Sequence, residues 1–178
     1  LRLYGPGAVS KPDHESGLQV DSGIDGVTGA PLTWIWSGAT EDTWALMVRD
    51  KRSYLDLSGP ARFRWRIRPR GLTLMRPVVK LADGTMFVGD VVGTSQSDFH
   101  EEEFFLASVP RWKRINPERV VGFNDNGPVD AAGFRLTLDL TKVDEVGFTD
   151  LTHGGGHGAG AMPSNCDWIE VYGKLVPR

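Results

Sequence analysis

The sequence predicts an all-β domain, a two-sheet antiparallel β-sandwich of the jelly-roll kind. Three observations indicate this: short segments alternate apolar and polar residues, turn-forming residues separate these segments, and no stretch carries three turns of amphipathic helix. Glycine and proline are frequent, with 22 and 11 copies spread along the chain. About ten short strands separated by such turn residues are typical of a sandwich or a barrel.

The length of 178 residues fits one domain, which we assign to residues 1–178, and it is sufficient to bury a core. Hydrophobic residues make up 40% of the chain and charged residues 24%, with a net charge of -3. This charge provides no basic field for nucleic acid or for an anionic membrane. No apolar run approaches the roughly 18 residues that span a bilayer.

The clearest strand covers Ala61–Arg68, where large apolar side chains alternate with arginines. Alternation directs one set toward the core and the other to the opposite face. The apolar set consists of Phe63, Trp65 and Ile67, and the opposite set of Arg62, Arg64, Arg66 and Arg68. Phe134–Leu140 repeats the pattern, with its phenylalanine and alternate leucines directed inward.

The last expected strand is Asp167–Val176. It places Ile169 and Val171 on one face and an aromatic and acidic set, Trp168, Glu170 and Tyr172, on the other. The remaining expected strands are Leu32–Trp36, Thr43–Val48, Leu74–Leu81, Met86–Val88, Phe99–Leu106, Val120–Phe123 and Val143–Phe148.

Turn chemistry refines these elements. Asp83-Gly84 lies between two expected strands and predicts a tight hairpin turn. Pro77 lies inside one strand, which we therefore expect to be at a sheet edge or bulged. The polar stretches Gly5–Gly29 and Thr152–Asn165 are expected to be surface loops, and the first has room for a hairpin.

The row of outward arginines is the first candidate for function. Alternate residues of a strand lie about 6.5–7 Å apart on one face, so Arg64 and Arg66 could grip an acidic ligand such as a uronic-acid polysaccharide. The alternative is cross-strand pairing with carboxylates on neighbouring strands. The acids available for such pairs are Glu101, Glu103, Asp139 and Glu170.

Aromatic residues are the second candidate, because the chain has 6 tryptophans. Trp168 and Tyr172 share the polar side of the last strand, where an aromatic ring can stack on a sugar while polar neighbours bind its hydroxyls. Packing beneath a loop or another strand is the alternative. Trp34 and Trp36 share a face, and we expect them to pack in or beside the core.

Two histidines, His153 and His157, flank three glycines. Glycine disfavours a helix there, so the segment predicts a turned loop. The loop could contact a ligand, with the histidines as hydrogen-bond partners, could contribute to a transition-metal site, or could serve only backbone conformation.

Enzyme signatures are largely missing from the sequence. It contains no nucleophile elbow, P-loop, dinucleotide fingerprint or His-Glu-x-x-His motif. Cys166 is the only cysteine, so no internal disulfide forms, and its neighbour Asp167 would raise the thiol pKa rather than activate it. Whether two of the outward acids form a pair for glycoside hydrolysis is left open by the sequence.

One segment carries a resemblance to a known family. The run Asp167-Trp168-Ile169-Glu170-Val171-Tyr172, preceded by a Gly-rich loop and the strand Val143–Phe148, resembles the C-terminal end of galactose-binding-like jelly-roll modules. Asp56-Leu57-Ser58-Gly59 also resembles an early turn of these modules. Many carbohydrate-binding modules of secreted polysaccharide-degrading enzymes have this fold, which hosts many other functions as well.

The resemblance implies several properties. It implies a secreted or periplasmic protein, consistent with a chain that starts at Leu1 without a methionine. It also implies a structural calcium, for which Glu170 is the position to test, although a single Glu stands here instead of a paired acid. We therefore expect a non-catalytic carbohydrate-binding domain for a glycan or polysaccharide, with an acidic polysaccharide as one ligand class.

Two alternatives to this function are kept. The first is a small glycoside hydrolase or polysaccharide lyase that acts on an acidic sugar. The second is a structural or interaction β-sandwich within a larger assembly. The expected ligand-binding residues are Trp168, Tyr172, Arg64, Arg66, His153 and His157, with Glu170 as the expected metal ligand.

Overall fold

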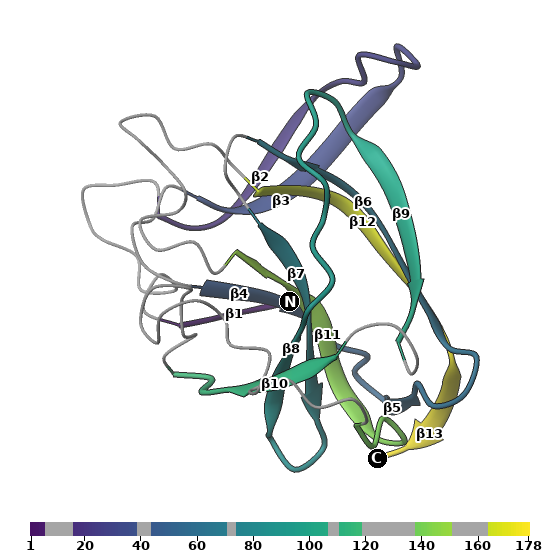
Figure 1. Ribbon diagram of the computed structural model, residues 1–178. Coiled ribbons are helices and arrows are strands. Elements are labelled where there is room, and N and C mark those ends of the chain that lie inside the picture. The colour runs from purple at the N-terminus through teal and green to yellow at the C-terminus, as the bar shows by residue number, and fades with distance from the viewer. Residues whose placement is uncertain (6–15, 39–43, 71–73, 107–110, 119–137, 151–163) are drawn as a thin grey trace.

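The computed structural model describes the chain over residues 1–5, 16–38, 44–70, 74–106, 111–118, 138–150 and 164–178. All regular elements within these ranges are strands, and they form two antiparallel sheets that pack as a sandwich (Figure 1). The predicted fold class is confirmed. No helix in the described residues is long and apolar enough to cross a membrane.

The larger sheet has eight strands within the described residues, in the order β1-β4-β11-β7-β8-β10, with β5 and β13 joined at the side of β11. Its strands are β1 (Arg2–Tyr4), β4 (Trp44–Val48), β5 (Ser53–Asp56), β7 (Met75–Leu81), β8 (Met86–Gly89), β10 (Trp112–Ile115), β11 (Val143–Asp150) and β13 (Lys174–Pro177).

The smaller sheet has five strands in the described part of the chain, in the order β2-β3-β12-β6-β9. Its strands are β2 (Ser16–Ile24), β3 (Pro31–Gly38), β6 (Arg62–Pro69), β9 (His100–Phe105) and β12 (Ser164–Tyr172). In Figure 1 the far end of the β2–β3 hairpin projects at the top of the molecule, beyond the larger sheet.

The core lies between the sheets and follows the alternation of the strands. Phe63, Trp65 and Ile67 on β6 are fully buried, as the sequence predicts. Phe63 stacks on Phe104 of β9 with ring centroids 5.1 Å apart, and Trp44 and Phe148 meet edge to face at 5.5 Å on the larger sheet. These aromatic contacts fill the space between the layers and fix which face of β6 points outward.

The turn at Asp83-Gly84 is confirmed. Gly84 has a positive φ of 88° and joins β7 to β8, closed by a hydrogen bond from the Leu81 amide to the Thr85 carbonyl. Pro77 was expected to mark a sheet edge or a bulge. As a whole β7 lies between β11 and β8, and its register shift lies opposite Leu81 and Lys80, away from Pro77. Pro77 is tolerated there because the β7–β8 ladder begins only at Val78, so this residue has a strand partner on the β11 side alone.

The expected last strand is in fact two strands. β12 ends at Tyr172 and pairs with β6 in the smaller sheet, whereas β13 begins at Lys174 and pairs with β5 in the larger sheet. Gly173 lies at this crossing, where a Cβ would come within 2.7 Å of the backbone oxygen of Asp56. The close approach of the two backbones at Gly173 allows the chain to change sheets.

The Gly5–Gly29 stretch is only partly a loop, because residues 16–24 form β2 and pair with β3. The strands expected at Val120–Phe123 and at residues 134–137, and most of the 152–165 loop, lie outside the described residues. Residues 138–140, the end of the strand expected at Phe134–Leu140, are not in a strand.

Candidate functional site

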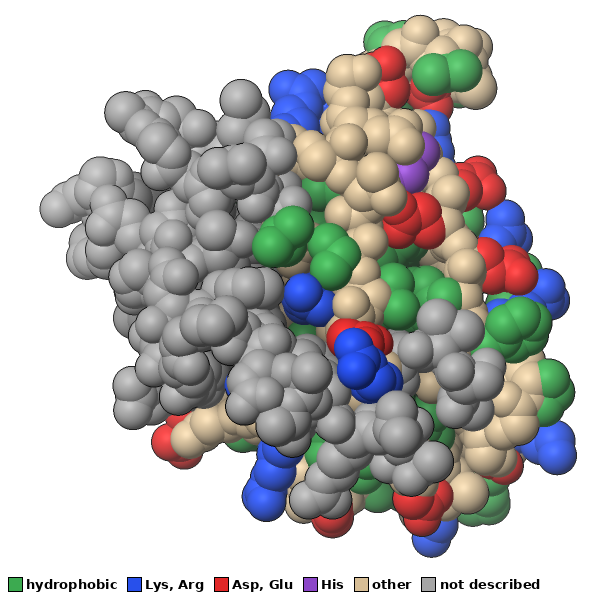
Figure 2. All heavy atoms as spheres, viewed as in Figure 1, with side chains coloured by type: hydrophobic (Ala, Val, Ile, Leu, Met, Phe, Trp, Pro, Cys, Tyr) green, Lys and Arg blue, Asp and Glu red, His purple; other side chains and the backbone are tan. Residues whose placement is uncertain are grey.

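The outer face of the smaller sheet brings together four of the predicted ligand-binding residues and Glu170, the expected metal ligand. Register places Arg62, Arg64 and Arg66 of β6 opposite Tyr172, Glu170 and Trp168 of β12, and opposite Phe105, Glu103 and Glu101 of β9. We call this surface, built around Arg62, Arg64, Arg66 and Arg68, the arginine face. Along the right-hand margin of Figure 2, basic and acidic side chains alternate where Figure 1 draws β9.

Arg64 stands at the centre of an ion-pair cluster. Its guanidinium pairs with Glu101 at 3.0 Å, Glu103 at 3.2 Å and Glu170 at 3.0 Å. It also donates a hydrogen bond to the Tyr172 hydroxyl at 3.3 Å, and this bond, with the nearby carboxylates, raises the pKa of Arg64. The alternative interpretation of cross-strand pairing is therefore confirmed for this arginine.

Arg66 connects two other carboxylates. It donates to Asp167 at 2.6 Å and to Asp25, which follows β2 at the start of the β2–β3 turn. Hydrogen bonds from the backbone amides of Thr28 and Val27, with the Arg66 guanidinium, lower the pKa of Asp25 to about 2. Arg66 thereby ties the projecting hairpin to β6 of the smaller sheet.

Aromatic rings lie against the arginines along the face. The guanidinium of Arg62 lies 4.5 Å from the Tyr172 ring centroid, and that of Arg64 lies 5.4 Å from the Trp168 ring. Such contacts hold a ring against the guanidinium through the attraction between cation and π-system. Tyr172 keeps 41% of its surface exposed, so its ring is held but not covered.

Trp34 and Trp36 also belong to this surface, and the expectation that they pack in or beside the core is wrong. Cys166 of β12 faces the core opposite Ile35, so the neighbouring tryptophans of β3 point outward. Trp34 packs against Phe99 at 5.7 Å between ring centroids, and the Trp36 indole donates to Asp21 at 2.8 Å. Both rings are half-buried at the edge of the arginine face.

A hollow of about 410 Å³ opens on the face beside Trp168. Its walls combine an aromatic ring, an arginine and carboxylates with the β2–β3 turn, namely Trp168, Arg66, Glu101, Asp167, Asp25 and Thr28, together with residues 30–33. Polar groups that converge beside an aromatic surface are the usual composition of a small-ligand site.

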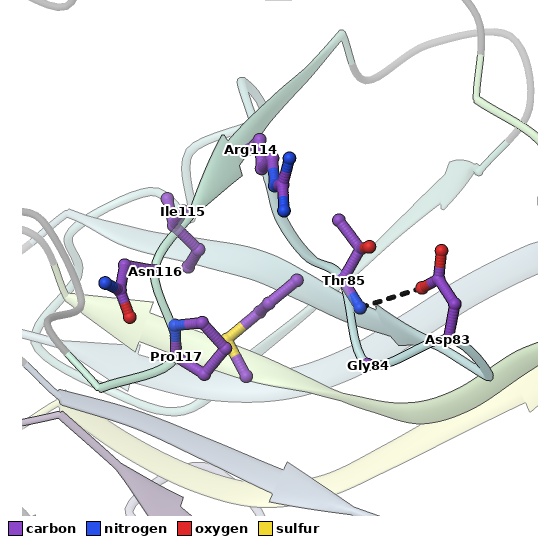
Figure 3. A pocket seen from close by; sticks show the side chains of 8 residues that line it. Asp83, Gly84, Thr85, Arg114, Ile115, Asn116 and Pro117 are labelled. Carbon is purple, nitrogen blue, oxygen red and sulfur yellow. Dashed lines mark hydrogen bonds between the residues drawn. The ribbon is translucent and has the colours of Figure 1, made fainter.

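A second hollow, of about 610 Å³, lies on the larger sheet between the β7–β8 turn and the end of β10 (Figure 3). Thr85 and Asp83 line one end, where the Asp83 carboxylate accepts the Thr85 amide at 2.8 Å, and Asn116 and Pro117 line the other. None of its described lining residues is aromatic or belongs to the predicted site. The arginine face is therefore the better candidate.

Glu170 does not fit the calcium role that the resemblance implies. Its carboxylate accepts hydrogen bonds from Arg64 and from the Tyr172 hydroxyl, both at 3.0 Å, whereas calcium takes six to eight oxygen ligands. The described residues hold no group of three or more His, Cys, Asp or Glu side chains able to bind a metal. Calcium binding elsewhere stays a prediction. His153 and His157 lie outside the described residues.

Sequence reasoning missed three residues of this face. Asp25 lies in a stretch that was expected to be a loop, Phe99 directly precedes β9, and Asp167 lies at a β-bulge between Cys166 and Trp168 where the register shifts. Only the density of acids near an arginine strand hinted at Asp25 and Asp167. Alternation along the expected strand Phe99–Leu106 places Phe99 on the same side as Glu101 and Glu103, which is the signal that could have found it.

A solved structure supports the fold of this chain. A family 11 carbohydrate-binding module of the cellulosomal cellulase Lic26A-Cel5E of Clostridium thermocellum is 17% identical over 89% of this chain and 84% of its own, with a TM-score of 0.50. A second structure, of a family 11 module from the same organism in complex with a β-1,3-1,4-mixed-linked tetrasaccharide, has 20% identity, coverage of 89% and 85%, and a TM-score of 0.47.

These identities are low, so the first comparison bears on the fold alone. At that level it confirms the expected likeness to carbohydrate-binding modules with a jelly-roll sandwich. No protein-family model matches the sequence, and no curated protein matches it in sequence.

Proposed function

We propose that this domain is a non-catalytic carbohydrate-binding module that holds a glycan across the arginine face. The observation that carries the proposal is the hollow beside Trp168, where an aromatic ring, the Arg66 guanidinium and the carboxylates of Asp25 and Asp167 converge. A pyranose presents an apolar C–H face and a rim of hydroxyls, and this set of groups complements both.

The length of the face supports a chain-like ligand. Alternate residues on one side of a strand are about 6.5–7 Å apart, so Arg62 to Arg68 spans about 20 Å. Tyr172 lies at one end of this row, Trp168 near its middle and Trp34 at the other end. Aromatic rings spaced along a rigid sheet suit several successive sugar units better than a single monosaccharide.

Charge on the face argues against a uniformly acidic polymer. Arg62, Arg64 and Arg66 all pair with carboxylates of the protein, and a ligand carboxylate would have to displace one of these. Paired in this way, the arginines and acids present fixed donors and acceptors to neutral hydroxyls. We therefore propose a largely neutral glycan chain in place of a polyuronate.

The same pairing favours binding over catalysis. A glycosidase needs one carboxyl group with a raised pKa and a second placed for water or for nucleophilic attack. Glu101, Glu103 and Glu170 all pair with the Arg64 guanidinium, so each of these carboxylates is already engaged by the protein. A module that binds without cleaving accounts for these acids. Export from the cell remains part of the proposal, as an exterior polysaccharide would require.

Affinity electrophoresis in gels that contain soluble neutral or acidic polysaccharides tests the proposal. We expect retardation by at least one polysaccharide, and Trp168→Ala to weaken that binding about tenfold or more, because the ring would be the central anchor. Tyr172→Ala should weaken it less, since Tyr172 lies at one end of the row.

Tyr54→Ala is the matched control. Tyr54 is also a strand tyrosine with a guanidinium, that of Arg178, 4.5 Å from its ring, but it lies on β5 of the larger sheet. Its replacement should leave retardation unchanged. No retardation by any polysaccharide, or equal binding by the wild type and a folded Trp168→Ala variant, would overturn the proposal. Release of reducing ends from a polysaccharide would show that the domain is catalytic.

A further inference from the structure

Arg68 differs from the other arginines of the face. Carboxylates pair with Arg62, Arg64 and Arg66, but within the described part of the chain no carboxylate forms an ion pair with Arg68. Its guanidinium instead lies 4.5 Å from the Phe99 ring centroid and 5.0 Å from that of Trp34. Aromatic faces, and no ion-paired carboxylate, therefore lie against the charge of this side chain among the described residues.

The two rings form a shallow aromatic corner under the guanidinium. Their centroids are 5.7 Å apart and their planes meet at 49°, so Arg68 rests on both rings at once. The Nε atom of Arg68 is buried and has no hydrogen-bond partner. Its two terminal nitrogens are not among the buried atoms of the described residues that lack a partner. The terminal nitrogens are thus placed to donate to a ligand.

Asn165 provides an independent observation at the same place. It is the cross-strand partner of Arg68, only 1% of its surface is exposed, and its Oδ1 atom has no hydrogen-bond partner. Buried polar atoms without partners are uncommon in folded proteins and call for a specific explanation. The two atoms, a donor on Arg68 and an acceptor on Asn165, lie on cross-strand neighbours and indicate a place for a ligand that offers both an acceptor and a hydroxyl donor.

The electrostatics favour an anion. Burial lowers the pKa of Arg68, and the nearby charge of Arg70 lowers it further, against a smaller opposing effect of Asp98. The protein therefore holds a cation where its own surroundings disfavour the charge. A carboxylate at this position would relieve that cost, and its two oxygens match the planar guanidinium fork.

We propose that Arg68, on its corner of Trp34 and Phe99, forms a subsite for the carboxylate of a uronic acid unit in the bound glycan. The inference rests on the proposed function and deepens it, because it assigns an acidic unit to one end of an otherwise neutral chain. Arg68 is two residues from Arg66, so the subsite lies about 6.5–7 Å from the hollow.

Titration of the isotope-labelled full chain with D-glucuronate and with D-glucose, followed by NMR, tests the subsite directly. The side-chain Nε–H of Arg68 and the indole N–H of Trp34 report on it, and the indole N–H of the buried Trp112 serves as an internal control. We expect glucuronate to shift the first two signals with at least about tenfold tighter apparent binding than glucose. Equal response to both sugars would overturn the subsite.

Acetate separates a sugar-acid subsite from simple anion binding. If acetate produces the same shifts at the same concentration as glucuronate, the site holds an adventitious ion only and the proposal fails. Arg68→Gln should reduce glucuronate binding to the level of glucose, and Arg68→Lys should restore only part of the preference, since lysine lacks the planar fork. Arg178→Gln is the control, because Arg178 lies against Tyr54 off the face.

The two proposals fail in different ways. Loss of the Arg68 response while Trp168 still governs retardation by a neutral polysaccharide would overturn the subsite and leave the carbohydrate-binding function intact. Absence of retardation by any polysaccharide would overturn the function, whatever the response of Arg68.

Discussion

Asp25 and Arg66 are joined by a hydrogen-bonded ion pair although 41 residues separate them in the chain. Asp25 also accepts the backbone amides of Val27 at 2.8 Å and Thr28 at 3.0 Å. One carboxylate thus closes the β2–β3 turn and attaches it to β6. The hollow beside Trp168 depends on this attachment, because the turn forms one of its walls.

The first prediction concerns pH. The folded-state pKa of Asp25 is about 2, below the ordinary value near 4, so the ionised group stabilises the fold above pH 4 and this contribution is lost as the pH falls from about 4 to about 2. Asp25→Asn should unfold more easily than the wild type at pH 6, and the difference should shrink through that window. Chemical denaturation at several pH values measures it. A difference that is constant from pH 6 to pH 2 would contradict the assignment.

The second prediction concerns Gly147 at the centre of the larger sheet. A Cβ at this position would overlap the backbone oxygen of Leu46 and lie 2.8 Å from the Cα of Met47. Gly147→Ala should therefore destabilise the domain by about 3 kcal/mol or more, since backbone on a central strand cannot easily yield. Gly59→Ala is the comparison: its φ is 65° and its Cβ would meet nothing within 4 Å, so we expect a loss of about 1 kcal/mol. Similar losses for both would show that close packing at Gly147 is not the cause.

Period-two alternation predicted which side chains of a strand face the core and which belong to the arginine face. It placed Trp65 in the core and Arg64 outside, and it placed Trp168 and Tyr172 on the polar side of the last strand. In the structure both aromatic residues lie opposite the arginines of β6. These assignments need only the geometry of one strand at a time. Which strands become neighbours depends on packing between the sheets, and alternation carries no information about it.

The errors follow from that limit. Trp34 and Trp36 share a face and were expected in or beside the core, yet the pairing of Ile35 with Cys166 turns them outward. Gly173 looks like an ordinary strand residue in the sequence, and only the position of Asp56 in the other sheet explains the break there. Asp25 reaches Arg66 through a turn, where no periodicity applies.

The third prediction concerns the ion-pair cluster around Arg64. Arg64→Met removes the cation shared by Glu101, Glu103 and Glu170 and leaves three carboxylates close together. We expect a lower Tm at low ionic strength and a smaller decrease at 1 M NaCl, where salt screens the repulsion between the acids. Arg111→Met is the control, because Arg111 pairs with Asp90 alone among the described acids. A decrease in Tm that does not depend on salt would show that packing of the Arg64 side chain, not charge, stabilises the sheet.

The fourth prediction concerns Cys166, which faces the core from β12 with 1% of its surface exposed. Burial raises the pKa of its thiol, and the neighbouring charge of Asp167 raises it further, so almost no thiolate forms in the native state at pH 8. A chromogenic thiol reagent should therefore react with the native domain only at the rate at which the domain opens, and at once in 6 M guanidinium chloride. Because Asp25→Asn loosens the β2–β3 hairpin and not the core strands, it should accelerate the reaction less than Gly147→Ala. Immediate, complete reaction of the folded wild type would contradict the buried position of Cys166 and, with it, the register that turns Trp168 outward.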